Sequence, residues 1–314
     1  MSPVSIASER LQILRDRAAM LARARSFFSE RNILEVDCPQ LTNGASVDAH
    51  IDLIPAIYQN SDIRYLHSSP EYGMKRLIVE GIGDIYQLSH VFRDGEYGHK
   101  HNPEFCMAEW YRMGISFEAM IEETLDFIRL FLGPLPSSTY SYRQLFQDIG
   151  IDYQHASQKE LLSFLQKYPG IETETTESLL NLILGLIIEP KLGKNELSVL
   201  AYYPASQAAL AKTLQKEDEA VALRFEIYYK GVELCNGYSE LAHPKEQRAR
   251  FEKANQERLQ LGKQPLPLDD FFLSALEKGL PDCCGVAVGF DRLMMLRHST
   301  ATLAEVLPFD WKSA

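Results

Sequence analysis

The sequence has few cysteines and no long apolar segment, and each of these absences excludes a class of protein. The chain of 314 residues contains 5 cysteines, an odd number without a C-x-x-C pair. A disulfide framework or a cysteine-rich zinc site is therefore not indicated, and a reducing compartment is expected. The longest apolar run, LLNLILGLII at 179–188, is shorter than the roughly 20 residues that a membrane-spanning helix needs. Since the amino terminus also lacks the apolar centre of a signal peptide, we expect a cytoplasmic protein with no membrane partner.

Positive charge is also scarce. The 32 lysines and arginines are outnumbered by 43 aspartates and glutamates, which gives a net charge of -11. Such a chain has no general attraction to a polyanion, so charge does not favour a nucleic acid as partner, although a local basic groove is compatible with this total. The remaining composition, 46% hydrophobic and 24% charged, is typical of a globular protein with a sizeable core.

Three segments have the hydrophobic spacing of helices. Residues 9–30 predict an amphipathic helix with Ser8 as its N-cap. Residues 117–132 predict a second helix, ended by Gly133, and residues 244–263 a polar one. The apolar face expected for the first helix comprises Leu11, Leu14, Ala18, Leu21 and Phe28.

Other segments are typical of strands. Residues 64–79 (RYLHSSPEYGMKRLIV) and 83–112 predict antiparallel strands joined by polar loops. Residues 222–241 predict further strand with a bend at Asn236-Gly237. Residues 285–298 (GVAVGFDRLMMLRH) predict a strand that runs into a helix. We find no clean domain boundary and expect a single domain over 1–314.

The stretch HNPEFCMAEWYR at 101–112 places a carboxylate among apolar groups. Because side chains of a strand alternate between its faces, one face carries Cys106, Ala108 and Trp110. The other face carries Phe105, Met107, Glu109 and Tyr111. An unpaired charge at Glu109 would cost several kcal/mol, so this residue requires a cation.

Four carboxylates stand in or beside apolar strands: Glu71, Glu109, Glu233 and Glu240. Together they suggest a cationic ligand or a metal, although each alone is also compatible with an ion-paired or edge-strand glutamate. The Asn236-Gly237 bend could bring Glu233 and Glu240 together, and two converging carboxylates suit magnesium bound to the phosphates of a nucleotide.

Cationic and small residues complete the candidate site. Arg93 opens a loop that also contains His101 and is followed by Phe105, so the loop could place cations on phosphates and an aromatic ring on a base, or be a solvated hairpin tip. The small residues Gly285, Ala287 and Gly289 alternate on one face of the later strand, just before Arg292. A flat group could approach the backbone there, or the strand could simply pack tightly.

Taken in order, these segments resemble the catalytic core of the class II aminoacyl-tRNA synthetases, specifically of lysyl-tRNA synthetase. Residues 30–41 (ERNILEVDCPQL) resemble the first motif of that family, 91–105 (VFRDGEYGHKHNPEF) the second and 285–292 (GVAVGFDR) the third. The likeness runs from about residue 10 to the carboxyl terminus. It implies an α+β fold with an antiparallel β-sheet flanked by helices, and a homodimer supported by the first motif.

The resemblance also implies an ATP site and a site for a lysine-like substrate. The residues implied for ATP are Arg93, Asp94, Gly95, His101, Phe105, Glu233, Leu234, Gly289 and Arg292. Those implied for the substrate are Ser69, Pro70, Glu71, Glu109, Tyr111, Glu240 and Ala287. Arg93 and Arg292 would be catalytic, and Glu233 and Glu240 would hold Mg²⁺. The substrate carboxylate would attack ATP to give an aminoacyl-adenylate.

Short stand-alone members of this family look most similar to the present chain. They share SSPEY, HNPEF and PASQA with residues 68–72, 101–105 and 204–208, and they join (R)-β-lysine to a lysine of elongation factor P. The sequence starts almost at the catalytic core, without the OB-fold that reads the anticodon, so we expect elongation factor P rather than tRNA as acceptor. Ala287 stands where lysyl-tRNA synthetases usually have glycine, which would reshape the amino-acid pocket.

One position departs from the family pattern. The second motif normally reads Phe-Arg-x-Glu, but Gly95 stands at the last place and Glu96 follows it. Two alternatives are therefore kept: a truncated lysyl-tRNA synthetase core that acts on tRNA, and a non-catalytic regulatory paralogue that binds an amino acid or nucleotide. The retention of Arg93, Glu233, Glu240 and Arg292 favours an enzyme.

Overall fold

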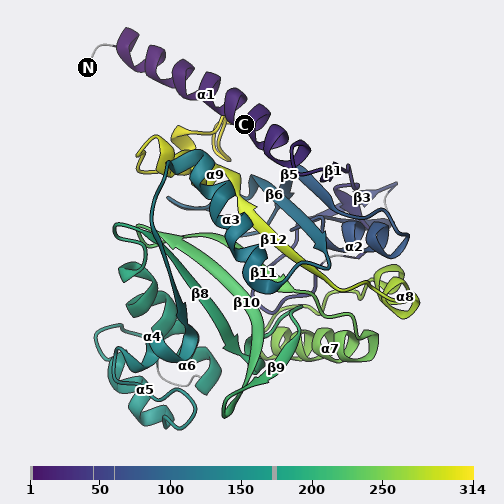
Figure 1. Ribbon diagram of the computed structural model, residues 1–314, viewed down its shortest axis with the longest axis vertical. Helices are drawn as coiled ribbons and strands as arrows, with labels where there is room; N and C mark the ends of the chain where they lie inside the picture. Colours follow the sequence, from purple (N-terminus) through teal and green to yellow (C-terminus); the bar gives the residue numbers. More distant parts are fainter. Residues whose placement is uncertain (1–2, 45, 60, 172–174) are drawn as a thin grey trace. The chain divides into compact units, whose positions relative to one another are not determined.

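The computed structural model describes residues 3–44, 46–59, 61–171 and 175–314 (Figure 1). These residues form two compact units. The first contains the described residues up to Gly133 together with Gly237–Ala314, and the second contains those of Pro134–Asn236. The middle of the chain therefore separates two parts of one unit that are distant in sequence.

The first unit is built on an antiparallel sheet. Its order is β1-β5-β6-β12, with β1 parallel to β5 and the other pairs antiparallel. These strands are β1 (Leu34–Glu35), β5 (Ile85–Phe92), β6 (Glu104–Met113) and β12 (Cys283–Gly289). A smaller antiparallel sheet comprises β2 (Leu41–Thr42), β4 (Asp62–Leu66) and β3 (Pro55–Tyr58). The helices are α1 (Pro3–Ser29), α2 (Glu71–Val79), α3 (Phe117–Leu132), α7 (Pro244–Gln260), α8 (Asp270–Lys278), α9 (Phe290–Arg297) and the 3-10 turn η4 (Leu303–Glu305). The predicted antiparallel sheet flanked by helices is confirmed.

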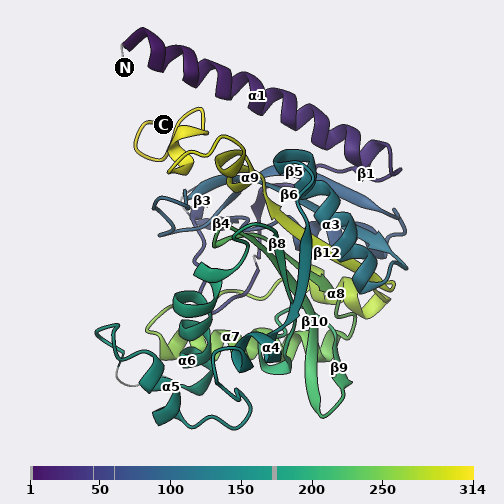
Figure 2. The same ribbon diagram turned by 60° about the vertical axis from the view of Figure 1, so that its left-hand side comes forward.

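Strand β6 has the predicted alternation, and its apolar face forms an aromatic core. The Trp110 ring lies 5.2 Å from that of Phe28 in α1 and 5.3 Å from that of Phe127 in α3. Phe28 also stacks on Tyr86 of β5, with ring centroids 4.1 Å apart. These rings fix α1 and α3 on one face of the sheet (Figures 1 and 2). Glu109 and Tyr111 therefore point to the other face.

Helix α1 differs from its prediction. It begins at Pro3, a residue suited to the first turn of a helix, so Ser8 is not its N-cap. Its buried side also differs from the expected one: Leu11 is 55% exposed, whereas Arg17, Met20 and Ala24 are buried. The helix is turned so that Arg17 faces inward, and the reason is a buried acid.

That acid is Asp291, at the start of α9. Nη1 of Arg17 lies 2.5 Å from Oδ1 of Asp291, and the two side chains are only 8% and 2% exposed. The second oxygen, Oδ2, accepts a hydrogen bond of 2.7 Å from the backbone N–H of Cys106 in β6. One carboxylate thus joins α1, α9 and β6, which are far apart in the sequence.

The predicted strand over 64–79 is only partly correct. Strand β4 ends at Leu66, and Glu71–Val79 form helix α2. Pro70 precedes the helix, and Tyr72, Lys75 and Ile78 are buried at helical rather than alternating spacing. The predicted helices over 117–132 and 244–263 correspond to α3 and α7, and the predicted strand and helix over 285–298 to β12 and α9.

The second unit combines strands with short helices. Its strands are β7 (Ser137–Ser141), β8 (Leu197–Pro204), β9 (Thr213–Lys216), β10 (Glu219–Tyr229) and β11 (Val232–Ser239), the last of which continues past Asn236. β8 pairs in parallel with β7 and antiparallel with β10, and β9 pairs with β10. The helical segments are α4 (Tyr142–Gln147), α5 (Gln158–Phe164), α6 (Thr176–Ile183), the π-helical turn η1 (Leu184–Ile188), and the 3-10 turns η2 (Glu189–Lys191) and η3 (Ala205–Gln207).

The predicted bend at Asn236-Gly237 is wrong, because both residues lie within β11. The turn between β10 and β11 is instead at Lys230 and Gly231, with φ of 51° and 67°. Two consecutive positive φ values are typical of the tight turns that join antiparallel strands. The Asn-Gly pair resembled such a turn in sequence, but Lys-Gly forms it.

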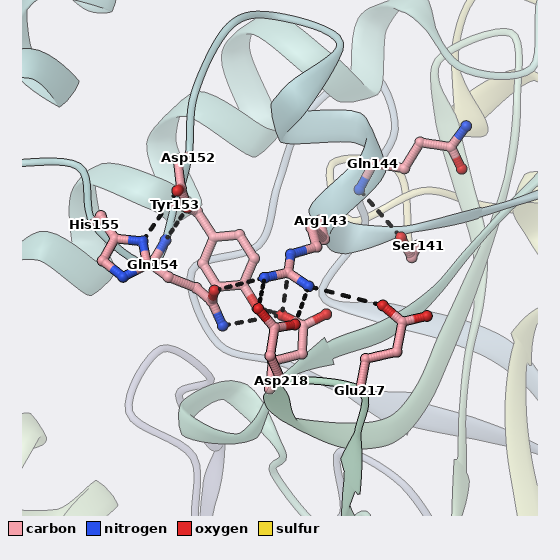
Figure 3. A network of polar contacts seen from close by, with 10 residues as sticks. Ser141, Arg143, Gln144, Asp152, Tyr153, Gln154, His155, Glu217 and Asp218 are labelled. Carbon is pink, nitrogen blue, oxygen red and sulfur yellow. Dashed lines mark hydrogen bonds and ion pairs between the residues drawn. The ribbon is translucent and has the colours of Figure 1, made fainter.

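A polar network holds the β9–β10 hairpin of the second unit (Figure 3). Arg143 in α4 forms an ion pair with Asp218, where Nη1 and Oδ1 are 2.5 Å apart, and donates to Gln154 at 2.8 Å. Tyr153 donates a hydrogen bond to Glu219 at the start of β10. The network therefore ties the hairpin to α4 and to the loop that follows it.

Two expectations about composition can also be compared with the structure. Across residues 3–44, 46–59, 61–171 and 175–314, no helix combines the length and the apolar character needed to cross a bilayer. The five cysteines, for which no disulfide framework is indicated by the sequence, are buried free thiols.

The Arg17–Asp291 ion pair gives a prediction about stability. Replacing Arg17 by methionine should lower the free energy of unfolding by about 3–5 kcal/mol, because Asp291 would be left buried without its cation. Arg15→Met, at an exposed position of the same helix, should change it by less than about 0.5 kcal/mol. Urea unfolding measures both variants, and equal losses would contradict a special role for Arg17.

Candidate active site

The start of α2 and the polar face of β6 bring together predicted substrate residues. Ser69 Oγ donates a hydrogen bond of 2.7 Å to Oε2 of Glu109, and the Tyr111 hydroxyl donates one of 2.8 Å to Oε1. Ser69 Oγ also accepts from the backbone N–H of Glu71 at 3.0 Å, with Pro70 between them at the N-cap of α2. The structure thus joins the Ser69–Glu71 strip to Glu109 and Tyr111.

Glu109 is a buried carboxylate that no cation neutralises. It is 2% exposed, and its two hydrogen-bond partners, Ser69 and Tyr111, are neutral hydroxyls. Within the part of the chain that the structure describes, no lysine, arginine or histidine nitrogen lies within ion-pair distance of it. Burial, together with the charge of Glu71, raises the pKa of Glu109 to about 7. The arrangement therefore favours a ligand that brings a positive charge.

Lys75 is the site residue that the sequence reasoning missed. Its Nζ lies 2.5 Å from Oε1 of Glu71 and 2.5 Å from Oε2 of Glu240, and the side chain is 1% exposed. The backbone N–H of Glu240 donates to the carbonyl of Cys283 in β12 at 3.0 Å. The spacing of four residues between Glu71 and Lys75 is the signal that could have shown this pair. The strands predicted over residues 64–79 would place Glu71 and Lys75 differently, so the helical spacing of this pair is not evident from that prediction.

Glu71, Glu109 and Glu240, which we call the acid cluster, are held at a common site by these contacts. Burial raises the pKa of Glu240 to about 8, with Lys75 opposing this effect and the charge of Glu71 adding to it. Burial alone would lower the pKa of Lys75, but Glu240 and Glu71 together outweigh it and hold that pKa above its ordinary value. Lys75 is therefore a protonated cation inside the acid cluster.

Strand β12 forms the wall next to the acid cluster. In its register with β6, Gly285 lies opposite Tyr111, Ala287 opposite Glu109, and Gly289 opposite Met107. A Cβ at Gly285 would collide with the Tyr111 ring and would lie 2.5 Å from Oε1 of Glu240. At Gly285 the strand therefore packs tightly against side chains of the protein, which is the second of the two alternatives expected for this strand. Gly289 is different, since its nearest neighbour would be Cδ of Arg292 at an ordinary 3.5 Å.

The predicted nucleotide residues lie on the loop between β5 and β6. The Arg93 guanidinium is centred 5.2 Å from the Phe105 ring, and its Nη1 lies 3.7 Å from Oε1 of Glu96. The buried Nε of Arg93 has no hydrogen-bond partner among the described residues. An unsatisfied guanidinium beside an aromatic face suits an anionic ligand with a flat ring.

Gly95 explains how Glu96 comes to lie beside Arg93. Its φ of 74° is in the left-handed region, which glycine adopts without strain. The preceding residue, Asp94, is exposed, and its N–H donates to the carbonyl of Asp52 at 2.9 Å. The loop therefore places the carboxylate of Glu96, one position later than the family pattern, within 3.7 Å of the arginine.

Arg292 and His101 form a second cationic group. Nη2 of Arg292 lies 2.8 Å from Nε2 of His101. Partial desolvation and the charge of Arg292 lower the pKa of His101, which favours a neutral ring that accepts from the guanidinium. Asp291, immediately before Arg292, is anchored to Arg17 and to Cys106. The first turn of α9 that carries Arg292 is thus held by the core.

The two predicted magnesium ligands, Glu233 and Glu240, both lie in the described residues, and a site formed by this pair stays a prediction. No group of three histidine, cysteine, aspartate or glutamate side chains there could hold an ion. Glu240 is buried and shares Lys75 with Glu71. Glu233 and Leu234 belong to β11 in the second unit, where Leu234 is buried and Glu233 is partly exposed.

The family described as tRNA synthetases class II (D, K and N) matches residues 5–312 of this chain. The chain belongs to this family. Similar relatives include the elongation factor P--(R)-beta-lysine ligase of Avibacterium paragallinarum, which is 41% identical over 312 residues and 97% of both chains. Proteins of the same name from Vibrio parahaemolyticus and Haemophilus influenzae are 39% and 40% identical, over 97% and 93% of each chain. The resemblance found in the three sequence motifs is confirmed.

The contrast between two glycines of this synthetase-family chain can be tested. Gly285→Ala should lower kcat/KM by at least about tenfold, because the added methyl would displace the Tyr111 ring and Glu240 from the acid cluster. Gly185→Ala, at an exposed position where an added Cβ would meet no atom within 4 Å, serves as the control and should change kcat/KM by less than about threefold. Steady-state kinetics of amino-acid activation measure both, and similar effects would show that the wall at Gly285 is not critical.

The raised pKa of Glu109 predicts that binding depends on pH. An ammonium ligand binds the ionised carboxylate, and a carboxyl group with a pKa of about 7 goes from roughly one-tenth ionised at pH 6 to roughly nine-tenths at pH 8. Affinity for a lysine-type ligand should therefore rise by about tenfold or more between these values. Calorimetric titration of Glu109→Gln should show weaker binding and a shallower rise. A flat profile in the unaltered protein would contradict the prediction.

Proposed function

We propose that this chain activates (R)-β-lysine with ATP and transfers it to a lysine side chain of elongation factor P. Relatives that match nearly the whole chain are named elongation factor P--(R)-beta-lysine ligase, which supports this proposal. The observation that carries the proposal is Glu109, a buried carboxylate with two hydroxyl partners and, among the described residues, no cation within ion-pair distance. A substrate with amino groups supplies the missing charge.

The charge of the acid cluster supports a substrate with two amino groups. Lys75 offers one ammonium to three carboxylates, so two negative charges remain when all three are ionised. A diamino acid carries two ammonium groups and matches this excess. An analogue that lacks an amino group leaves a buried carboxylate unpaired, which is penalised more strongly than a missing methylene. The substrate residues proposed here are Ser69, Pro70, Glu71, Glu109, Tyr111, Glu240 and Ala287.

Arg93 and Arg292 are proposed as the catalytic groups. An oxygen of the substrate carboxylate attacks the α-phosphorus of ATP, the bond to the β-phosphate oxygen breaks, and pyrophosphate leaves. The two guanidinium groups stabilise the negative charge that develops on the phosphates. Phe105 beside Arg93 is proposed to stack on the adenine. No protein nucleophile is needed, because the substrate carboxylate performs the attack.

The transfer step uses the acceptor amine. The lysine side chain of elongation factor P attacks the carbonyl carbon of the adenylate, AMP leaves, and the nitrogen loses a proton as the amide forms. Mg²⁺ is retained as the ion that accompanies ATP, because its charge offsets the phosphates; Glu233 and Glu240 stay the predicted ligands. The proposal further includes a cytoplasmic homodimer, as the resemblance of residues 30–41 implies, and residues 1–314 as one catalytic domain.

Incubation of the purified chain with ATP, magnesium and (R)-β-lysine tests this function. Pyrophosphate exchange should depend on the amino acid, and the intact mass of elongation factor P should increase by one β-lysyl group. Arg93→Ala should lower exchange by at least about a hundredfold, because it removes a cation from the phosphates. Transfer to tRNA instead of the protein would favour the tRNA-dependent alternative. Absence of exchange with every amino acid would favour a non-catalytic paralogue.

A further inference from the structure

Lys75 has no role in the function proposed so far, yet it is among the most deeply buried charged residues of the chain. Its side chain is 1% exposed and makes ion pairs of 2.5 Å with both Glu71 and Glu240. A lysine is seldom buried so completely unless its charge is compensated. Here two carboxylates surround one ammonium, so the positive charge of Lys75 is fully compensated.

The surroundings hold the Lys75 ammonium at a fixed place. Its Nζ lies 5.9 Å from the centre of the Tyr111 ring and 6.0 Å from that of Phe272 in α8. Phe272 in turn stacks on Tyr72 of α2, with centroids 4.3 Å apart. Aromatic rings therefore close two sides of the ammonium, and the carboxylates take its hydrogen bonds. A lysine enclosed in this way has little freedom to leave the acid cluster.

The two ion pairs also affect how much negative charge the acid cluster offers to a ligand. Glu71 comes from α2, whereas Glu240 follows β11 and is bonded to β12, so Lys75 is the cation that the two carboxylates share. Without this cation, three buried carboxylates would face one another. The least costly response would be to take up a proton or to turn away, and either response removes a negative charge that an ammonium ligand could meet.

We propose that Lys75 is a specificity-determining residue, which holds Glu71 and Glu240 in place so that the acid cluster selects a substrate with two ammonium groups over one with a single ammonium. This inference rests on the proposed function and adds to it the residue that positions two carboxylates of the site. Lys75 acts through Glu71 and Glu240 and is therefore a positioning residue rather than a catalytic one.

The test compares three replacements of Lys75. Lys75→Met removes the charge and the hydrogen bonds, Lys75→Gln keeps a hydrogen-bond donor without the charge, and Lys75→Arg keeps the charge. Lys278→Met, at an exposed position in the last turn of α8, is the control. Each protein is assayed by pyrophosphate exchange with (R)-β-lysine and with two monoamines that each lack one of its amino groups, 3-aminohexanoate and 6-aminohexanoate. Thermal unfolding reports whether each variant is folded.

The expected result is a loss of selectivity. In Lys75→Met and Lys75→Gln, the ratio of kcat/KM for the diamine to that for at least one monoamine should fall by about tenfold or more, mainly through the KM of the diamine. Lys75→Arg and Lys278→Met should stay within about threefold of the unaltered ratio. Lys75→Gln distinguishes charge from hydrogen bonding, and it also serves if Lys75→Met does not fold.

Two outcomes would overturn the inference in different ways. Equal losses for the diamine and both monoamines would show that Lys75 only supports the fold, while the proposed function would stand. If the unaltered chain activates no diamino acid at all, the proposed function fails and the role of Lys75 fails with it. The activity of the unaltered protein therefore separates the two conclusions.

Discussion

The alternation of side chains along β6 is the constraint on which both the core and the candidate site depend. Trp110 packs on Phe28 and Phe127 on one face of the sheet. Because successive side chains of a strand point to opposite faces, this packing places the neighbouring residues, Glu109 and Tyr111, on the other face of the sheet. A shift of one residue in the register would exchange the two sets. The aromatic core thus fixes the place of a carboxylate that contributes nothing to the core.

The site combines charges that are neutralised within the protein with two charged groups that are not fully satisfied there. Arg17 and Asp291 neutralise each other and hold the first turn of α9. Lys75 serves Glu71 and Glu240. Glu109 has only hydroxyl partners, and the Nε of Arg93 has none among the described residues. A ligand with an ammonium group would neutralise Glu109, and a ligand with a phosphate would bind the Arg93 guanidinium.

The sequence was sufficient where local rules decide the structure. The alternation along β6, helix α3 with its end at Gly133, and the family motifs could be read directly, and the structure or the comparisons agree with them. It was insufficient where distant residues decide. Arg17 is buried because Asp291 lies opposite it, and no local pattern on α1 contains that information. Lys75 was missed for a related reason, since its meaning depends on α2 being a helix and on Glu240, far along the chain.

The wall formed by β12 has a consequence for how this protein could acquire a different substrate. Gly285 cannot accept a single additional carbon without moving Tyr111 and Glu240, so a larger residue there would disturb two side chains of the site. Ala287 lies directly opposite Glu109 and is only partly buried. A change in the size of the bound amino acid is therefore accommodated more easily by a substitution at position 287 than by one at Gly285. A library of variants randomised at position 287 alone would test which other amino acids the site can accept.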